Sequence, residues 1–303
     1  MKMWDFRKME GSRIAIDSDI SEAVGMAEGS QVYSTLFKYE EGNAKKYELI
    51  LSTYAPENYR TLSQITFYMR DVPGSTAQAA KFLGDRGINI LNSVSMNVIS
   101  DVGIVWKMLV DLGFTGEIDL IKEGFQELAR RNDPSISKLD HIEVQSSDIG
   151  RIFSRSIHSG LGGKMEQMRG GPMPLKDGGF DLSGDYSQYL DELRDCTAMV
   201  VAVPESWLLS VTFLRRESHL VGMRFSIPDS PGSIYRVTQA LSDLDINLVS
   251  VFTKVVISYE KMAMEIVADA GGYAGGMAEL QREIESALVY LNGPYALEKF
   301  SEV

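Results

Sequence analysis

The sequence is poor in cysteine and has no long apolar run. Cys196 is the only cysteine, so an internal disulfide is excluded and a reducing compartment is indicated. None of the apolar runs reaches the roughly 18 residues of a membrane-spanning helix. Residues 1–6 also lack the apolar core of a secretory signal peptide. We therefore expect a cytoplasmic protein without a membrane segment.

Positive charge is also scarce. The chain has 30 Lys and Arg residues against 42 Asp and Glu residues, which gives a net charge of −12. Because nucleic acids are bound largely through cations, this balance does not favour broad nucleic-acid contact. Residues 148–180 are an exception, since they combine basic residues with many glycines. We interpret them as a flexible linker or exposed loop. A phosphate-binding loop is the alternative, although residues 162–165 lack the spacing of a Walker motif.

Signatures of catalysis are missing. The three histidines, His141, His158 and His219, show no metal-ligand spacing with one another or with Cys196. The sequence contains no nucleophile elbow, zinc-binding helix motif or dinucleotide fingerprint. We expect a non-enzymatic protein without a metal or cofactor. A Cys/His nucleophilic pair stays open from the sequence, because the fold can bring distant residues together.

The chain contains an internal repeat, whose second copy follows the first at an offset of 158 residues. The segment Asp71-Val72-Pro73-Gly74-Ser75 returns as Asp229-Ser230-Pro231-Gly232-Ser233, and Asn89 returns as Asn247. Between Asp71 and Ile90, eight of twenty positions are identical in the two copies, where average residue usage would give roughly one or two. A period this long indicates two copies of a domain-sized unit.

Each copy shows the same order of predicted elements. A strand ends at the Pro-Gly turn, a helix follows up to Gly87 or Asp245, and two β-branched strands, a second helix and a last strand complete the copy. In the first copy, the expected elements span 63–69, 75–86, 88–100, 104–111, 116–132 and 139–144. In the second copy, they span 223–227, 234–244, 248–258, 262–268, 277–288 and 295–300. The order βαββαβ, with two helices on one face of a four-stranded antiparallel sheet, is the ferredoxin-like arrangement.

Weaker similarity continues upstream of each copy. Residues 49–52 align with residues 207–210 at the same offset, so each half is expected to carry an extra strand. Residues 32–39 and 47–54 are typical of a hairpin. We therefore expect an α+β chain of two ferredoxin-like units, each with an N-terminal β-containing extension. The expected boundaries are an N-terminal extension over 1–60, a first unit over 61–147, a basic linker over 148–180, a second extension over 181–220 and a second unit over 221–303.

The paired motif, a strand, Asp-x-Pro-Gly-Ser, a helix, then Ile-Asn-Ile or Ile-Asn-Leu, resembles the ACT domain over about 65–147 and 223–303. This resemblance implies a module that senses small molecules, commonly amino acids, for metabolic enzymes and regulators. It also implies side-by-side pairing through the first strand and helix, with the ligand between the turn of one unit and the asparagine of its partner. The implied ligand-binding residues are Asp71, Pro73, Gly74, Ser75 and Asn89, and Asp229, Pro231, Gly232, Ser233 and Asn247.

The chemical groups at these positions are able to bind an amino acid. The backbone N–H groups at each Gly-Ser pair open a helix and can receive a carboxylate, and an asparagine can meet either end of a zwitterion. Asp71 and Asp229 stand where many family members have asparagine, so each either contacts the ligand's ammonium group or merely caps its helix. The units can also pair without binding anything.

We therefore expect a homodimeric regulatory protein that senses an amino acid or similar metabolite. Because no catalytic domain is evident, its output is expected to be a partner protein, such as an enzyme of amino-acid metabolism.

A second resemblance lies near the N-terminus. Residues 13–33, which begin Arg13-Ile14-Ala15-Ile16-Asp17, look like a swapped-hairpin segment of AbrB-type DNA-binding proteins. Asp17 stands where such proteins usually have proline, and basic residues are sparse here. An ordinary strand–helix–strand segment explains the pattern equally well. A DNA-binding regulator with ACT-like effector domains is the alternative function.

Overall fold

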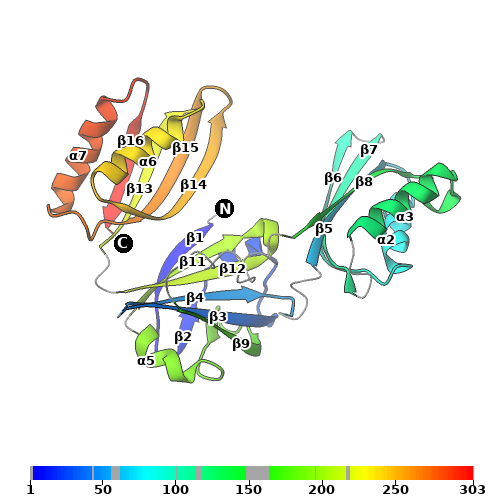
Figure 1. The fold of residues 1–303 in the computed structure, drawn as a ribbon, viewed down its shortest axis with the longest axis horizontal. Helices are drawn as coiled ribbons and strands as arrows, with labels where there is room; N and C mark the ends of the chain where they lie inside the picture. The colour runs from blue at the N-terminus through cyan, green and yellow to red at the C-terminus, as the bar shows by residue number, and fades with distance from the viewer. Residues whose placement is uncertain are drawn as a thin grey trace. The chain divides into compact units, whose positions relative to one another are not determined.

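The computed structural model describes residues 3–42, 44–55, 62–99, 102–113, 118–147, 164–194, 196–215 and 219–302. The chain divides into two compact units, Met1–Phe213 and Leu214–Val303. The compact unit Met1–Phe213 contains the first ferredoxin-like sheet and a β-rich part, here called the β domain. Residues of both sequence halves build the β domain. The second unit is the second ferredoxin-like sheet (Figure 1).

The first ferredoxin-like sheet has the predicted order of elements. They are β5 (Leu62–Arg70), α2 (Ser75–Gly84), β6 (Asn89–Ile99), β7 (Gly103–Asp111), α3 (Ile118–Arg130) and β8 (Leu139–Ser146). The strands lie in the order β6-β7-β5-β8, and hydrogen-bonded neighbours are antiparallel. Alternate residues of β5, including Ile65 and Phe67, are buried against Phe82 of α2 and Phe125 of α3. Side chains of a strand alternate between the two faces of a sheet, so the buried residues of β5 all point to the face on which both helices pack.

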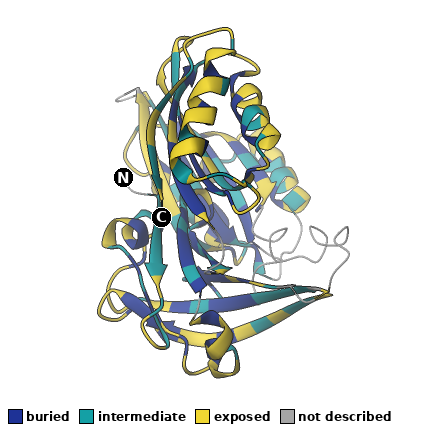
Figure 2. Ribbon diagram, turned by 90° about the vertical axis from the view of Figure 1, so that its left-hand side faces the viewer, coloured by how far each residue is buried: buried dark blue, intermediate teal, exposed yellow. Residues whose placement is uncertain are grey.

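The second ferredoxin-like sheet repeats this plan. Its elements are β13 (Leu220–Pro228), α6 (Ser233–Asp243), β14 (Asn247–Ile257), β15 (Lys261–Asp269), α7 (Met277–Val289) and β16 (Ala296–Glu302), with strand order β14-β15-β13-β16. Phe225 of β13 takes the place of Phe67 and is fully buried with Val237 and Ile284. The outer faces of the helices carry exposed residues (Figure 2). The predicted α+β, ferredoxin-like fold is confirmed in both copies.

The β domain joins the two predicted extensions in one sheet. Its elements are β1 (Trp4–Lys8), β2 (Arg13–Ala15), α1 (Ser18–Ala23), β3 (Gln31–Glu41), β4 (Ala44–Ser52), β9 (Lys164–Pro174), β10 (Gly179–Asp181), α5 (Leu190–Leu193), β11 (Cys196–Val203) and β12 (Leu208–Arg215). Six strands lie in the order β1-β11-β12-β4-β3-β9, and β10 pairs with β2. The predicted hairpin is confirmed as β3 and β4.

The two halves exchange strands within the β domain. Strand β1 of the first half pairs with β11 of the second, and β9 of the second half pairs with β3 of the first. At the centre, β4 pairs with β12 so that Leu51 faces Leu209, its own counterpart in the repeat. Side chains of both halves, among them Ile14, Leu36 and Phe180, fill one common core. The two extensions are therefore parts of a single domain.

The segment expected to be a linker is partly a strand. Residues 148–163, with His158, lie outside the described residues, but β9 and β10 occupy most of 164–181. The expectation of a linker or exposed loop is wrong for these strands. Gly170 shows why a glycine can stand inside such a strand, because a Cβ at this position would lie 2.7 Å from the Tyr186 hydroxyl oxygen. The glycine at this position permits a close approach of packed chains rather than flexibility.

Among the described helices, none has both the length and the apolar character that crossing a bilayer requires.

Candidate ligand site

The repeated motif builds the same backbone corner in both ferredoxin-like units. Strand β5 ends at Arg70, and Gly74 begins α2 with φ of 89°. Gly232 begins α6 with φ of 86°. These are left-handed conformations that glycine adopts without steric cost, and proline before it cannot extend the sheet. The two glycine corners therefore follow directly from the Pro-Gly dipeptides.

Each glycine corner presents backbone donors. In the described part of the chain, no backbone carbonyl receives the N–H of Thr76 or Ala77 in α2, or of Ile234 or Tyr235 in α6. Such groups lie in the first turn of a helix, where the helix dipole also favours negative charge. A carboxylate is a suitable ligand for these donors.

The serines of the motif hold the corner together. Ser75 and Ser233 are both 2% exposed. The Ser75 hydroxyl donates to the Val72 carbonyl oxygen over 2.9 Å. The Ser233 hydroxyl lies 2.9 Å from the hydroxyl oxygen of Ser230. In each case the partner is a residue of the turn itself, so these hydroxyls stabilise the corner.

Neither aspartate caps its helix. The N-cap residues are Gly74 and Gly232, without a side-chain cap. Asp71 instead accepts a hydrogen bond from the Asn97 side chain over 3.1 Å, and Asp229 accepts one from the Tyr259 backbone N–H over 2.7 Å. The capping interpretation is thus wrong. Each carboxylate connects its corner to the following hairpin, and contact with a ligand stays a prediction.

The asparagines lie at the opposite end of their own sheets. Asn89 opens β6 and faces Asp111, which in turn faces Leu62 at the start of β5. Asp71 follows the other end of β5, nine residues further on. At about 3.3 Å per residue, Asp71 and the end of the sheet that carries Asn89 are roughly 30 Å apart. The same holds for Asn247, so neither unit brings its own corner and asparagine together.

The two corners differ in what lies beside them. At the first, the Lys138 ammonium group donates to the Pro73 carbonyl oxygen over 2.7 Å, and it lies 2.8 Å from where a Cβ on Gly74 would be. Gln78 supports this arrangement by accepting from the Lys138 backbone N–H over 2.9 Å. At the second, no atom of the described residues lies within 4 Å of a Cβ on Gly232. The sequence analysis missed Lys138 and Gln78, because neither is part of the repeat.

The described residues considered for catalysis lie on different elements, and His158 lies outside the described residues. His141 lies on β8 beside Tyr68, with ring centroids 5.7 Å apart. The Cys196 thiol donates to the Glu192 carbonyl oxygen over 3.4 Å at the start of β11. His219 precedes β13 in the other unit. Within the residues that the structure describes, no group of three or more His, Cys, Asp or Glu side chains could hold a metal ion.

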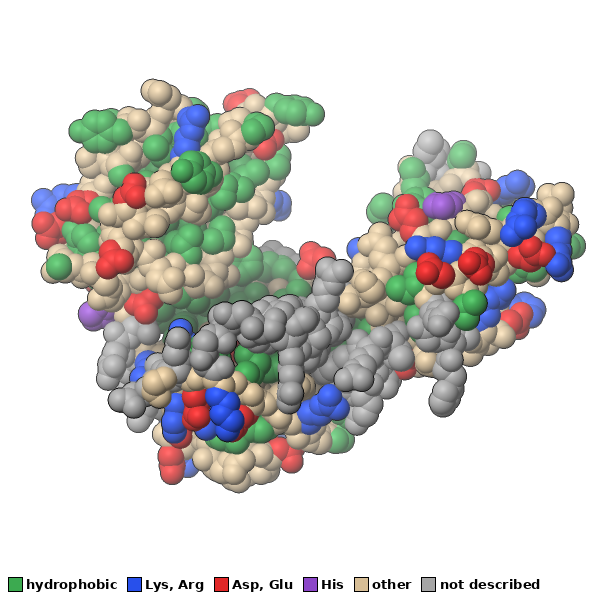
Figure 3. Space-filling model, viewed as in Figure 1, with side chains coloured by type: hydrophobic (Ala, Val, Ile, Leu, Met, Phe, Trp, Pro, Cys, Tyr) green, Lys and Arg blue, Asp and Glu red, His purple; other side chains and the backbone are tan. Residues whose placement is uncertain are grey.

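The residues proposed for DNA binding have structural partners. Arg13 donates to the backbone oxygen of Asp177 over 2.7 Å and so ties β2 to the turn before β10. Asp17 caps α1 by accepting from the Asp19 N–H over 3.0 Å. On the face shown in Figure 3, basic side chains of the β domain lie among acidic ones. These observations favour the ordinary strand–helix–strand interpretation of the N-terminal segment.

Comparison with known proteins gives weak matches to solved structures. No family model and no curated protein matches the chain. The regulatory subunit of aspartate kinase from Thermus thermophilus is 12% identical, with 75% of this chain and 93% of that chain covered and a TM-score of 0.18. The acetolactate synthase small subunit from Thermotoga maritima is 10% identical, with coverages of 80% and 96% and a TM-score of 0.21. The quorum-quenching acylase GqqA is 11% identical, with coverages of 94% and 84% and a TM-score of 0.22. At such scores these similarities carry no argument about function, which must come from the site.

Proposed function

We propose that this protein is a non-enzymatic regulator that senses an amino acid or a similar carboxylate-bearing metabolite at its glycine corners. The observation that carries the proposal is the exact doubling of the corner in three dimensions. Gly74 and Gly232 adopt the same left-handed conformation, and each precedes a helix whose first N–H donates within the turn, from Ser75 to Val72 and from Ser233 to Ser230, while the N–H groups of the next two residues have no backbone acceptor in the described chain. A carboxylate satisfies such donors.

The placement of the asparagines couples ligand binding to pairing of the units. Asn89 and Asn247 are exposed and open the edge strands of their sheets. Since each lies at the far end of its own sheet, a ligand can contact both a corner and an asparagine only when two units lie side by side. Ligand binding then favours the paired arrangement over the unpaired one. The pairing takes place within the chain or between two chains, and it is the signal that a partner protein reads.

The chemistry of the proposed site suits a zwitterion. The N–H groups of the corner receive the carboxylate, and the asparagine side chain of the paired unit accepts from the ammonium group. Asp71 and Asp229 add negative charge close to the corner, which favours a ligand that also carries a positive group. A dicarboxylate without an ammonium group is disfavoured for the same reason.

Thermal-shift measurements on the full chain with each of the twenty amino acids test this proposal. A ligand that binds the native state raises the melting temperature, and the rise grows with concentration. We expect Asn89→Ala together with Asn247→Ala to remove the rise caused by an amino acid that binds at the glycine corners, without changing the melting temperature of the free protein, because both side chains are exposed. Ser95→Ala, on an exposed residue of β6, is the matched control. A flat response to all twenty amino acids would refute a sensing role.

A further inference from the structure

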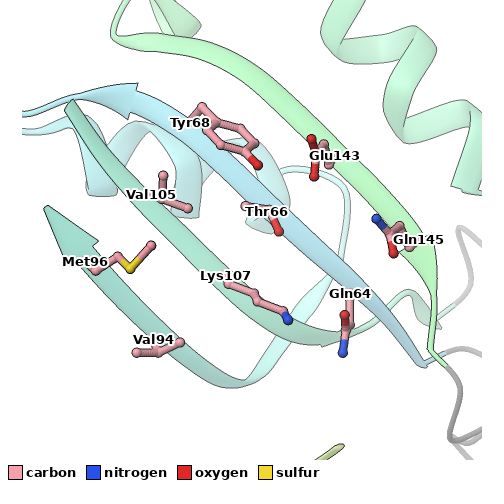
Figure 4. A pocket seen from close by; sticks show the side chains of 9 residues that line it. All are labelled: Gln64, Thr66, Tyr68, Val94, Met96, Val105, Lys107, Glu143 and Gln145. Atoms are coloured by element: carbon pink, nitrogen blue, oxygen red, sulfur yellow. The ribbon is translucent and has the colours of Figure 1, made fainter. Parts of the chain in front are cut away.

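The first ferredoxin-like sheet has a hollow on the face that its helices leave uncovered. The hollow has a volume of about 350 Å³, which lies in the range of small-molecule pockets. Strands β5, β6, β7 and β8 all contribute side chains to it (Figure 4). None of the ten residues of the glycine corners and their asparagines lines it. It is therefore a separate candidate site.

The strand register places a row of four side chains across this hollow. Val94 faces Lys107, Lys107 faces Thr66, and Thr66 faces Glu143. Neighbouring strands are about 4.8 Å apart, so the Cα atoms of Lys107 and Glu143, which lie on either side of β5, are separated by roughly 10 Å. The small, neutral Thr66 stands between them. One cation and one anion thus face solvent across a gap instead of forming a pair.

Both charged groups are available to a ligand. In the described parts of the chain, Lys107 and Glu143 take part in no ion pair. The neighbouring Tyr68 has its pKa raised by burial first, and then by the charge of Glu143 and a hydrogen bond to it. The raised pKa keeps Tyr68 neutral beside the Glu143 carboxylate.

An apolar strip borders the row. Val94 and Met96 on the edge strand β6 are 59% and 64% exposed, and Val105 lies beside them on β7. Exposed apolar side chains that gather next to polar groups are typical of a binding surface. Here they offer a hydrocarbon surface at the Lys107 end of the row.

The second ferredoxin-like sheet carries a different row at the same positions. Its residues, in the same order across the strands, are Phe252, Glu265, Arg224 and Lys299. Arg224 lies 3.8 Å from the Glu265 carboxylate and 3.4 Å from that of Glu298. Arg224 thus has carboxylate partners on both neighbouring strands. The separated charges are therefore particular to the first sheet and are not a property of the fold.

The lining of the hollow limits the chemistry of the ligand. A ligand that contacts both charged side chains needs an anionic group for Lys107 and a cationic group for Glu143, each able to form a charge-assisted hydrogen bond. The neighbouring apolar strip suits an aliphatic side chain. We propose that this face binds an aliphatic α-amino acid, with its carboxylate at Lys107, its ammonium group at Glu143 and its side chain on Val94, Met96 and Val105.

Isothermal titration calorimetry of the full chain with L-leucine tests the assignment. Leucinamide lacks the carboxylate and N-acetyl-leucine lacks the ammonium group, so each is expected to bind at least about tenfold more weakly than leucine. Lys107→Met should weaken leucine binding by a similar factor and remove the preference for leucine over leucinamide. Glu143→Gln should remove the preference over N-acetyl-leucine. A purely structural role for either residue would leave these preferences in place.

Three controls make the outcome decisive. Glu265→Gln alters the matching position of the second sheet and should leave leucine binding unchanged. Asn89→Ala and Asn247→Ala test the glycine corners, so the failure of one proposal can be told from the failure of the other. Lys107→Arg retains the charge and should retain binding. The assignment is overturned if the wild-type protein does not bind leucine at millimolar concentration, if both charge variants bind as the wild type does, or if the corner variants alone abolish binding.

Discussion

The two ferredoxin-like units share a backbone and differ in how their polar groups are used. Both fold Asp-x-Pro-Gly-Ser into the same corner, and both bury a phenylalanine at the centre of the first strand. In the first unit, however, Lys138 lies over the corner and the charges on the open sheet face are separated. In the second, the corner is open and the charges on the sheet face are paired. Duplication preserved the packing, which any copy needs, while the surfaces diverged.

The contrast indicates that the two corners would bind a carboxylate in different ways. The open corner at Gly232 is the better candidate for a ligand carboxylate held by backbone N–H groups alone. At Gly74 the Lys138 ammonium group adds a positive charge beside the same donors. A carboxylate there would gain a charged partner but would have to share it with the Pro73 carbonyl oxygen. The two corners should therefore bind with different affinities even where the ligand is the same.

The largest expected effect comes from the matched core phenylalanines. Phe67→Ala and Phe225→Ala each remove a fully buried ring and should each cost roughly 3–5 kcal/mol of unfolding free energy. Differential scanning calorimetry can assign the losses, because the two compact units should unfold in separate transitions. We expect Phe225→Ala to lower the transition of Leu214–Val303 and leave the other in place. A single transition that both variants shift equally would show that the units unfold together.

An intermediate effect is expected from the corner glycines. Gly74→Ala and Gly232→Ala place a Cβ on a left-handed backbone and should each cost about 1–2 kcal/mol, measured by chemical denaturation. The loss should be slightly larger at Gly74, because the new Cβ must displace the Lys138 ammonium group. Gly84→Ala is the matched control. Gly84 ends α2 with open space around it and without a positive φ, so alanine there should be neutral or stabilising.

If both corner variants were as stable as the wild type, the glycines would not be required by backbone geometry. Their repetition would then need another explanation, such as a direct contact with the ligand.

The smallest expected effect comes from removing the difference between the corners. Lys138→Met deletes an exposed hydrogen bond to the Pro73 oxygen, so it should cost only about 0.5–1 kcal/mol of stability. If the proposed carboxylate site is correct, the variant should also make ligand binding at the first corner resemble that at the second. Lys81→Met, on an exposed ion pair of α2, controls for loss of a surface charge. Titration calorimetry that gave the same profile for Lys138→Met and the wild type would assign Lys138 a role outside binding.

Much of each ferredoxin-like unit could be predicted because its signals are local. A Pro-Gly pair stops a strand, an alternating or helical apolar pattern marks the next element, and the βαββαβ order follows. The βαββαβ plan agreed with the structure for this reason, whereas the expected cap at Ser75 or Thr76 was wrong, because Gly74 is the N-cap of α2. The role of the aspartates was not predictable, since a capping aspartate and one that bonds to a hairpin occupy the same place in the sequence.

The β domain shows the limit of such prediction. The pairing of β9 with β3 joins residues far apart in the chain, so the basic, glycine-rich residues 164–174 looked like a loop. Strand exchange between the halves leaves no local pattern, and neither does the approach of Tyr186 to Gly170.

The sequence by itself determined the duplication, the fold of each copy and the two glycine corners, because backbone conformation at proline and glycine and the burial of apolar side chains are dictated by residues close in the chain. Only the tertiary structure decided that the two extensions form one sheet, that Lys138 lies over one corner, and that Lys107 and Glu143 face each other across Thr66. These facts depend on strand register and on contacts between distant segments, which no local pattern encodes.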